Sequence, residues 1–315
     1  MASSGAKTSN RGKLAVALLG GGKMGCDIAA LFAAGSWRVH VYEPVTAARA
    51  GFARRLQAAF TPLKAARGTA SRVQLHAHLQ ALPWPEVTLV IEAAPEKLSL
   101  KQNLMRAVEA LARGDAVLAT NSSSLKVGDV CKTLKNPARA AGVHFLTPAH
   151  IAPLVEVVRG PATSAATIRR INRWLHALGK LTVNLNRDVT GMLVNRVQGA
   201  LMREAFHLID KGIATAADID IAVRFGFGFR YLACGPIRQR DLNGLEIHRD
   251  AAAQIYPTLH NGKQPARCLE ALVRAGHIGV RSGRGFYPWD TATLKRELNA
   301  YDRKLAAALK LMARK

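Results

Sequence analysis

The chain of 315 residues has few cysteines, few aromatic residues and few acids, and it has no long hydrophobic run. The four cysteines (Cys26, Cys131, Cys234 and Cys268) are scattered without CxxC spacing, so we expect no disulfide framework, no zinc site and a reducing compartment. The longest apolar run, residues 14–19, is much shorter than the ~20 residues of a membrane-spanning helix, and it is too short for a signal peptide. We therefore expect a cytoplasmic protein without a membrane partner.

Acidic residues are scarce, because 21 Asp and Glu stand against 45 Lys and Arg, which gives a formal net charge of +24. No acid at all occurs in residues 44–85, where six basic residues lie. The positive electrostatic field of these basic residues attracts anions, including nucleotides, coenzyme A and nucleic acid. Aromatic residues make up only 6% of the chain, and no known nucleic-acid-binding module is recognisable. We expect a solvated basic surface and no dedicated nucleic-acid role.

The length predicts two domains, and the hydrophobic pattern changes near Asp188. Short apolar strands alternate with helical periodicity before this point, which predicts an α/β domain whose doubly wound, mostly parallel sheet is covered on both faces. Strands are expected at residues 14–19, 39–42, 87–93, 116–120, 140–144 and 154–158, and a further short apolar segment lies at 181–185. Helices are expected at residues 23–35, 45–66, 98–113 and 164–178.

Helical periodicity without a convincing strand continues from residue 191 to 276, which predicts an all-α second domain. We divide the chain into a flexible tail (1–13), an α/β domain (14–188), a helical substrate and dimerisation domain (189–290) and a basic C-terminal helix (291–315).

A G-x-G-x-x-G motif follows the first predicted strand and opens a helix. This arrangement is typical of dinucleotide binding, in which the glycines let the backbone approach a pyrophosphate at the helix N-terminus. The acid Glu43 closes the second strand and suits the ribose hydroxyls of NAD, whereas it would repel the 2′-phosphate of NADP; Arg49 weakens that preference. A glycine-rich turn without a ligand is the alternative. The predicted cofactor contacts here are Gly20, Gly22, Lys23, Met24, Gly25 and Glu43.

Polar residues at several strand ends are candidates for catalysis. His144 ends a predicted strand, and Glu156 lies twelve residues later within an apolar one. The residues alone leave open whether these two side chains meet. Ser123 follows the fourth strand, where α/β folds bind ligands, although serines there are also ordinary helix caps. Asn195 lies within a predicted helix, for which Asn is a poor former.

Seven ordered motifs between residues 14 and 289 resemble the L-3-hydroxyacyl-CoA dehydrogenase family, which includes the lambda-crystallin/gulonate and carnitine dehydrogenases. The motifs are GGGKMGCDIA (20–29), VIEAAPEKLSLK (90–101), TNSSSL (120–125), HFLTPAHIAPLVEVV (144–158), GMLVNR (191–196), GPIRQRDLNGLE (235–246) and RSGRGFYPW (281–289).

The resemblance implies a Rossmann-like fold and oxidation of a 3-hydroxyl to a ketone, with hydride transfer to NAD. It implies that His144 is the general base, that Glu156 orients it, and that Ser123 and Asn195 bind the reacting oxygen. It also implies a homodimer formed through the helical domain and a place in fatty acid metabolism. Further cofactor contacts implied by the matching motifs are Ala94, Glu96, Lys101 and Asn121.

Departures from the family pattern keep other substrates open. Thr147 replaces a common Asn, Asp27 occupies a small-residue position, and the segment after Glu43 is shorter than in acyl-CoA enzymes. Residues 226–231 resemble the branch that acts on free hydroxy acids, so Arg230 is a candidate carboxylate clamp. The alternatives are therefore a dehydrogenase of a small free 3-hydroxy acid and, outside enzymes, a non-catalytic nucleotide-binding protein of the crystallin kind.

Overall fold

The computed structural model describes residues 14–312, which form two units. The first unit ends at Arg196 and the second begins at Val197. The boundaries expected at 188/189 and 290/291 stay predictions. The expected tail (1–13) and the last three residues of the expected C-terminal helix lie outside the described residues.

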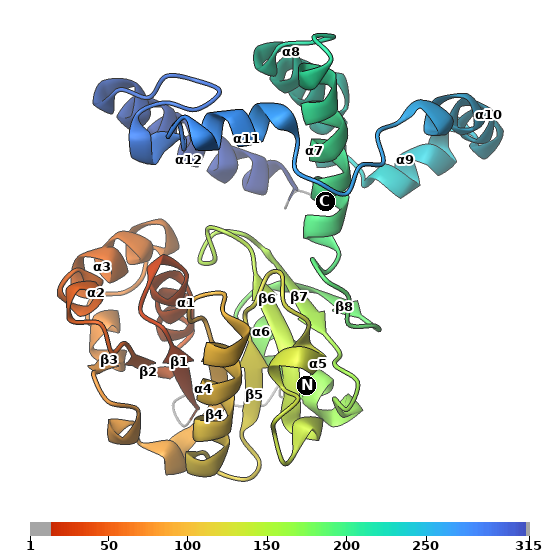
Figure 1. The fold of residues 1–315 in the computed structure, drawn as a ribbon. Coiled ribbons are helices and arrows are strands. Elements are labelled where there is room, and N and C mark those ends of the chain that lie inside the picture. Colours follow the sequence, from red (N-terminus) through yellow and green to blue (C-terminus); the bar gives the residue numbers. More distant parts are fainter. Residues whose placement is uncertain (1–13, 313–315) are drawn as a thin grey trace, which may run out of the picture. The chain divides into compact units, whose positions relative to one another are not determined.

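An eight-stranded sheet forms the centre of the first unit, in the order β3-β2-β1-β4-β5-β6-β7-β8 (Figure 1). Neighbouring strands are parallel except β6 and β7, which are antiparallel. The expected Rossmann-like class with a mostly parallel sheet is confirmed. The strands are β1 (Ala15–Leu19), β2 (Arg38–Tyr42), β3 (Val73–His76), β4 (Val87–Glu92), β5 (Val117–Thr120), β6 (Ala140–Phe145), β7 (Leu154–Val158) and β8 (Leu181–Leu185).

Helices cover both faces of this sheet, which explains why its central strands are continuously apolar. In β1, Val16 and Leu18 pack with residues of α1, α3 and α6, whereas Ala17 and Leu19 pack with residues of α4 and α5. The helices of the unit are α1 (Lys23–Ala34), α2 (Thr46–Ala50), α3 (Phe52–Leu63), α4 (Leu98–Leu111), α5 (Val127–Val130) and α6 (Ala165–Ala177). Short 3₁₀ turns occur at Thr69–Arg72, Leu79–Ala81, Trp84–Glu86 and Pro137–Arg139.

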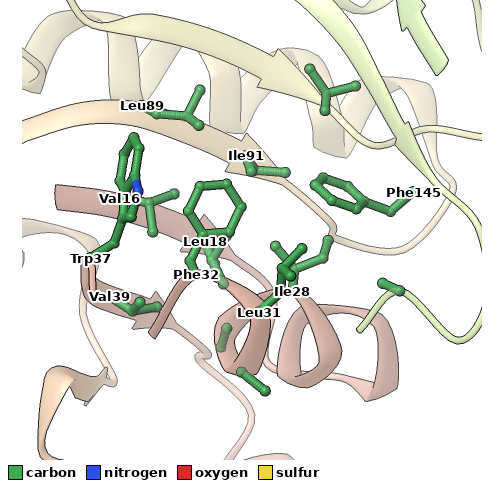
Figure 2. Packing of buried hydrophobic residues seen from close by; sticks show 14 of the residues in the cluster. Val16, Leu18, Ile28, Leu31, Phe32, Trp37, Val39, Leu89, Ile91 and Phe145 are labelled. Atoms are coloured by element: carbon green, nitrogen blue, oxygen red, sulfur yellow. The ribbon is translucent and has the colours of Figure 1, made fainter. Parts of the chain in front are cut away.

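Aromatic rings fill the core on the α1 side of the sheet (Figure 2). Phe32 meets Trp37 edge to face with ring centroids 5.1 Å apart, and it also contacts Phe145 at the end of β6. Trp37 contacts Trp174 of α6 in the same manner at 5.7 Å. The contact between Phe32 and Phe145 thus packs α1 against the end of β6, the strand that carries His144.

Two local predictions in this unit were wrong. The helix expected over residues 45–66 is two helices, α2 and α3, which are separated at Gly51. Gly is a poor helix former, and the Arg55 guanidinium donates to the carbonyl of Ala48, the last turn of α2. The second error is β3, which was not expected because its four residues, VQLH, are too few and too polar to show a strand pattern.

The second unit is helical in the part that the structure describes, apart from isolated bridges within residues 279–288. Helix α7 (Val194–Asp210) begins in the first unit and continues into the second. The other elements are α8 (Ala216–Ile221), a π-helical segment (Ala222–Phe227), 3₁₀ turns (Gly228–Leu232, Tyr256–Thr258 and Val280–Ser282), α9 (Pro236–Asn243), α10 (Leu245–Ile255), α11 (Arg267–Arg274) and α12 (Thr291–Met312). No helix within residues 14–312 has the length and apolar character needed to cross a membrane.

Candidate active site

The glycine motif forms a tight turn between β1 and α1. Gly20 has a positive φ of 119°, and a Cβ atom there would lie 2.7 Å from the carbonyl oxygen of Ala93. A Cβ atom at Gly25 would lie 1.9 Å from the carbonyl oxygen of Gly20, so only glycine lets α1 start this close to the turn. Gly22, by contrast, has open space around its Cβ position. The turn therefore presents bare backbone at the N-terminus of α1, as a pyrophosphate group requires. Lys23 and Met24 form the first residues of that helix.

Glu43 follows β2 and braces this turn. Its Oε2 accepts a hydrogen bond from the Gly21 N–H at 2.8 Å, and its Oε1 accepts one from the Val45 N–H at 2.9 Å. Each carboxylate oxygen retains a second lone pair, so the group can also accept bonds from ribose hydroxyls. The Arg49 guanidinium donates to the carbonyl oxygens of Glu43 and Pro44 and does not pair with the Glu43 carboxylate. These bonds hold Arg49 against the backbone beside the predicted ribose site.

A buried charge network supports the loops after β4 and β5. Lys101 is 1% exposed, and its Nζ lies 2.8 and 3.0 Å from the two carboxylate oxygens of Glu92. The same Nζ donates to the carbonyl oxygen of Ala94 and lies 3.2 Å from Glu96 Oε2. Glu92 also accepts bonds from the Ala94 N–H and the Thr120 hydroxyl, each at 2.7 Å. Glu92 was not among the residues predicted from the sequence, although a carboxylate at the end of an apolar strand, nine residues before a lysine, indicates a possible buried ion pair.

Glu96 organises the serine loop that follows β5. Its Oε1 accepts bonds from the hydroxyl of Ser122, from the N–H groups of Ser123 and Ser124, and from the Ser124 hydroxyl. Burial alone would raise the pKa of Glu96, but these bonds and the Lys101 charge lower that pKa to about 2. Among residues 14–312, no group bonds the Ser123 hydroxyl, which therefore remains available to a ligand.

Asn121 connects this loop to the next strand. Its side-chain Oδ1 accepts a bond from the N–H of Phe145 at 2.9 Å, and its own N–H donates to the carbonyl oxygen of Glu92. Phe145 directly follows His144, so the ends of β4, β5 and β6 are bonded together at one edge of the sheet. Ligands of α/β folds bind at this carboxyl edge.

His144 and Glu156 lie directly opposite each other in the antiparallel pair β6–β7. The distance between His144 Nδ1 and Glu156 Oε2 is 2.7 Å, and the two residues are 5% and 0% exposed. The other carboxylate oxygen, Oε1, accepts bonds from the N–H groups of Leu193 and Val194 at the start of α7. Within the described residues, His144 Nε2 has no hydrogen-bond partner. The structure thus brings the two candidates together and leaves one imidazole nitrogen free.

The remaining candidates divide between the two units. Asn195, the second residue of α7, donates from Nδ2 to the carbonyl oxygen of Ser123 at 3.3 Å, so these two residues meet within the first unit. Arg230 is exposed in the Gly228–Leu232 turn of the second unit, and its role as a carboxylate clamp stays a prediction.

Asp27 of α1 lies within ion-pair distance of two basic side chains. Its Oδ1 lies 3.2 Å from Nδ1 of His150, an ion-pair distance without the alignment of a good hydrogen bond, and its Oδ2 lies 3.4 Å from Lys23 Nζ. Burial alone would raise the pKa of Asp27, but His150 and Lys23 lower that pKa. The unusual acid in α1 is therefore compensated by two basic side chains.

The chemistry that this set of residues supports is proton transfer without a metal-binding cluster. Within residues 14–312, no group of three or more His, Cys, Asp and Glu side chains could hold a metal ion. A buried carboxylate fixes one nitrogen of His144, which leaves the other to exchange a proton with a ligand. The Ser123 hydroxyl and the Asn195 amide are neutral groups suited to an alcohol or carbonyl oxygen.

Comparison with known families gives two matches that together cover almost the whole described chain. Residues 15–189 match the model of the 3-hydroxyacyl-CoA dehydrogenase NAD binding domain, and residues 191–289 match that of the 3-hydroxyacyl-CoA dehydrogenase C-terminal domain.

Two curated relatives show the range of substrates among similar proteins. A probable 3-hydroxybutyryl-CoA dehydrogenase of Bacillus subtilis is 30% identical over 291 residues, 88% of this chain and 98% of the relative. A 5-formyl-3-hydroxy-2-methylpyridine 4-carboxylate 5-dehydrogenase of Mesorhizobium japonicum is 30% identical over 224 residues, 71% of this chain and 72% of the relative.

Two solved structures extend the comparison. The crystal structure of a 5-formyl-3-hydroxy-2-methylpyridine 4-carboxylic acid 5-dehydrogenase, described as an NAD⁺-dependent dismutase, matches 96% of this chain and 99% of its own with a TM-score of 0.90 and 28% identity. The (S)-3-hydroxybutyryl-CoA dehydrogenase of Ralstonia eutropha matches 88% of this chain and 99% of its own with a TM-score of 0.70 and 25% identity.

Proposed function

Because this chain belongs to the 3-hydroxyacyl-CoA dehydrogenase family of NAD-dependent oxidoreductases that act on CH–OH groups, we propose that it oxidises the 3-hydroxyl of an L-3-hydroxyacyl-CoA with a His–Glu general base. The observation that carries this proposal is the buried 2.7 Å contact between His144 Nδ1 and Glu156, with Nε2 left free. NAD, when bound at the glycine turn, would supply the acceptor for the hydride of the substrate carbon.

The chain's own residues manage the proton and the oxygen. His144 Nε2 takes the hydroxyl proton, and Glu156 holds Nδ1 so that the ring keeps one tautomer and one orientation. The N–H groups of Leu193 and Val194 hold the second oxygen of Glu156, so that the carboxylate cannot rotate away from the imidazole. General base catalysis of this kind contributes about 10²–10⁴-fold. The Ser123 hydroxyl and the Asn195 amide bind the oxygen that becomes the carbonyl.

The cofactor site uses the glycine turn and its supports. The backbone at Gly20 and Gly22 and the first turn of α1, with Lys23, Met24 and Gly25, would hold the pyrophosphate. Glu43 would bind the adenosine ribose. Ala94, Glu96, Lys101 and Asn121 would form or support the site of the nicotinamide end, since the Lys101 network keeps the loops after β4 and β5 in place.

The test is the oxidation of NADH by acetoacetyl-CoA, followed at 340 nm. We expect turnover by the wild-type protein and at least a hundredfold loss in His144→Ala, with NADH affinity unchanged in a fluorescence titration. A matched control is His78→Ala, since His78 precedes the short turn at Leu79–Ala81 and forms none of the described site contacts. Equal turnover by His144→Ala and the wild-type protein would contradict the proposed base.

A second candidate substrate is a small free hydroxy acid or a carboxylate-bearing alcohol. The TM-score of 0.90 to the pyridine carboxylate dehydrogenase, against 0.70 to the hydroxybutyryl-CoA enzyme, favours it. Turnover of carnitine or gulonate with NAD, without turnover of any CoA thioester, identifies this branch. NADH binding without turnover of either class instead supports a non-catalytic protein of the crystallin kind.

The second unit supports a homodimer. Within residues 197–312, only Ala205 and Gln239 are buried, whereas many large apolar side chains are exposed, among them Ile237 at 77%. A helical unit without a core of its own needs another apolar surface to cover it. Light scattering coupled to size exclusion should give twice the chain mass of 33.9 kDa. A cytoplasmic location and a place in fatty acid metabolism stay predictions.

A further inference from the structure

Lys180 is a buried charged residue that the proposed mechanism does not use. It precedes β8 and is 5% exposed. Its Nζ donates hydrogen bonds to two carbonyl oxygens, that of Ala149 at 2.8 Å and that of Ala152 at 2.7 Å. Both acceptors lie in residues 146–153, the segment that leaves β6 after His144 and returns as β7 towards Glu156.

This position is energetically expensive for a lysine. Fully buried lysines are rare unless an acid pairs with them, and no carboxylate within residues 14–312 forms an ion pair with Lys180. Burial alone lowers the pKa of its ammonium group to about 8, with no contribution from a neighbouring charge. An apolar side chain here would avoid that penalty but would leave both carbonyl groups without a donor. The bonds to residues 146–153 are the gain that offsets the burial.

Other contacts tie the same segment on two sides. The N–H of Leu181, next to Lys180, donates to the carbonyl oxygen of Pro153 at 2.8 Å. On the opposite side, His150 lies 3.2 Å from Asp27 of α1, the helix that begins at the glycine turn. The segment is therefore fixed between the start of β8 and the cofactor-binding helix, and Lys180 provides the two bonds at its centre.

We propose that Lys180 is a positioning residue for the catalytic pair: its ammonium group fixes residues 146–153 and so keeps His144 opposite Glu156. This inference rests on the proposed function, because it assigns a role relative to that pair. Lys180 touches neither the reacting groups nor the glycine turn. Misplacement of a catalytic group by about 1 Å can cost about a hundredfold in rate, so the loss of these bonds acts on the chemical step.

The experiment compares Lys180→Met, Lys180→Arg and the exposed-site control Lys132→Met with the wild-type protein. Methionine keeps the length of the side chain but has no donor, whereas arginine keeps a cationic donor. We expect Lys180→Met to lower kcat at least about tenfold, with KM and the NADH dissociation constant within about twofold of wild type. We expect Lys180→Arg to recover part of kcat and Lys132→Met to match the wild type.

Two further readouts do not depend on the substrate. Hydrogen exchange followed by mass spectrometry should show faster exchange in residues 146–158 of Lys180→Met, with β1 and α4 unchanged as a check on folding. The ¹⁵N resonances of the His144 ring should shift in the same variant, with assignment from His144→Ala.

The outcomes separate the two proposals. Absence of turnover by the wild-type protein on every substrate class overturns the proposed function, and the exchange and ring signals then decide the role of Lys180. The positioning role is overturned if Lys180→Met has the kcat of the wild type, the same hydrogen exchange in residues 146–158 and the same ¹⁵N resonances of the His144 ring. A large rise in KM with an unchanged kcat also overturns it, because it would place Lys180 in binding.

Discussion

Residues 14–196 and residues 197–312 bury apolar surface to very different extents. The first unit has two hydrophobic clusters, one on each face of its sheet, and strands such as β1 are completely buried. The second unit buries almost nothing by itself and exposes large apolar residues along most of its helices. The first unit therefore holds its glycine turn and its His–Glu pair by its own packing, whereas the proposed homodimer would cover the exposed apolar residues of the second unit.

The largest expected effect tests whether the first unit carries the chemistry. Glu156→Gln keeps the shape of the side chain but removes the charge that orients His144, so kcat should fall about 10²–10⁴-fold while NADH still binds. Steady-state oxidation of NADH measures the change.

The control for that substitution is Glu109→Gln. Glu109 also accepts two backbone N–H bonds, from Lys135 and Asn136, but it lies outside the site. Its variant should keep the wild-type kcat. Equal kcat values for Glu156→Gln and Glu109→Gln would contradict a role of the Glu156 carboxylate in the mechanism.

The next largest effect concerns the free energy of unfolding of the first unit. Leu18 is the fourth of the five residues of β1 and is completely buried, so Leu18→Ala should reduce the free energy of unfolding by about 2–5 kcal/mol. Urea titrations should give the same loss at low and high protein concentration. A loss that grows with dilution would mean that the core of this unit also depends on a partner.

The matching change in the second unit should act through association. Ile237 and Leu242 are exposed on α9, so Ile237→Glu combined with Leu242→Glu alters little within one chain, where surface changes stay within about ±0.5 kcal/mol. It should nevertheless convert the proposed dimer to monomers in light scattering. A wild-type protein that is already monomeric at micromolar concentration would contradict the proposal that the apolar surface of the second unit is covered by association.

A smaller effect is the pH dependence that Lys180 confers on the first unit. Its folded pKa, about 8, lies below the ordinary value of 10.5, so the unfolded chain binds more protons between these values. The stability of the wild-type protein relative to Lys180→Met should therefore rise as pH increases from 8 to 10.5. Urea unfolding at several pH values measures this, and a constant difference would mean that the amine is solvated.

Glu96 should give the smallest effect, with the same direction but in an acidic pH range. Its folded pKa is about 2, below the ordinary 4.5, so the ionised group stabilises the fold above pH 4.5. The advantage of the wild-type protein over Glu96→Gln should shrink as pH falls from 4.5 towards 2. Partial exposure of Glu96 weakens the effect through solvent screening. Parallel acid-unfolding curves for the two proteins would show that the serine loop does not need this charge.

Most of the fold could be predicted from local patterns, because buried strands and amphipathic helices leave a clear period in the sequence. β3 could not, since VQLH at the sheet edge buries too little to show a pattern. The break at Gly51 was missed because hydrophobic spacing shows neither the interruption at a single glycine nor the contact of Arg55 with the Ala48 carbonyl.

The candidate site was only partly visible in the sequence. The glycine turn is local and was therefore found from the motif. The meeting of His144 and Glu156 needs the antiparallel register of β6 and β7, which spacing alone cannot fix, and the motif resemblance supplied it. The role of Lys180 could not be predicted from the sequence, because its partners are backbone carbonyl groups, which every residue type supplies.

The most direct measurement is a crystal structure of the protein with NAD and a ligand bound, in which the position of the His144 ring is resolved. We expect Nε2 of His144 within hydrogen-bond distance of the ligand oxygen, Nδ1 on Glu156, and the nicotinamide ring against the ligand carbon. A ligand oxygen held elsewhere, with the His144 ring turned away from the nicotinamide, would contradict this expectation.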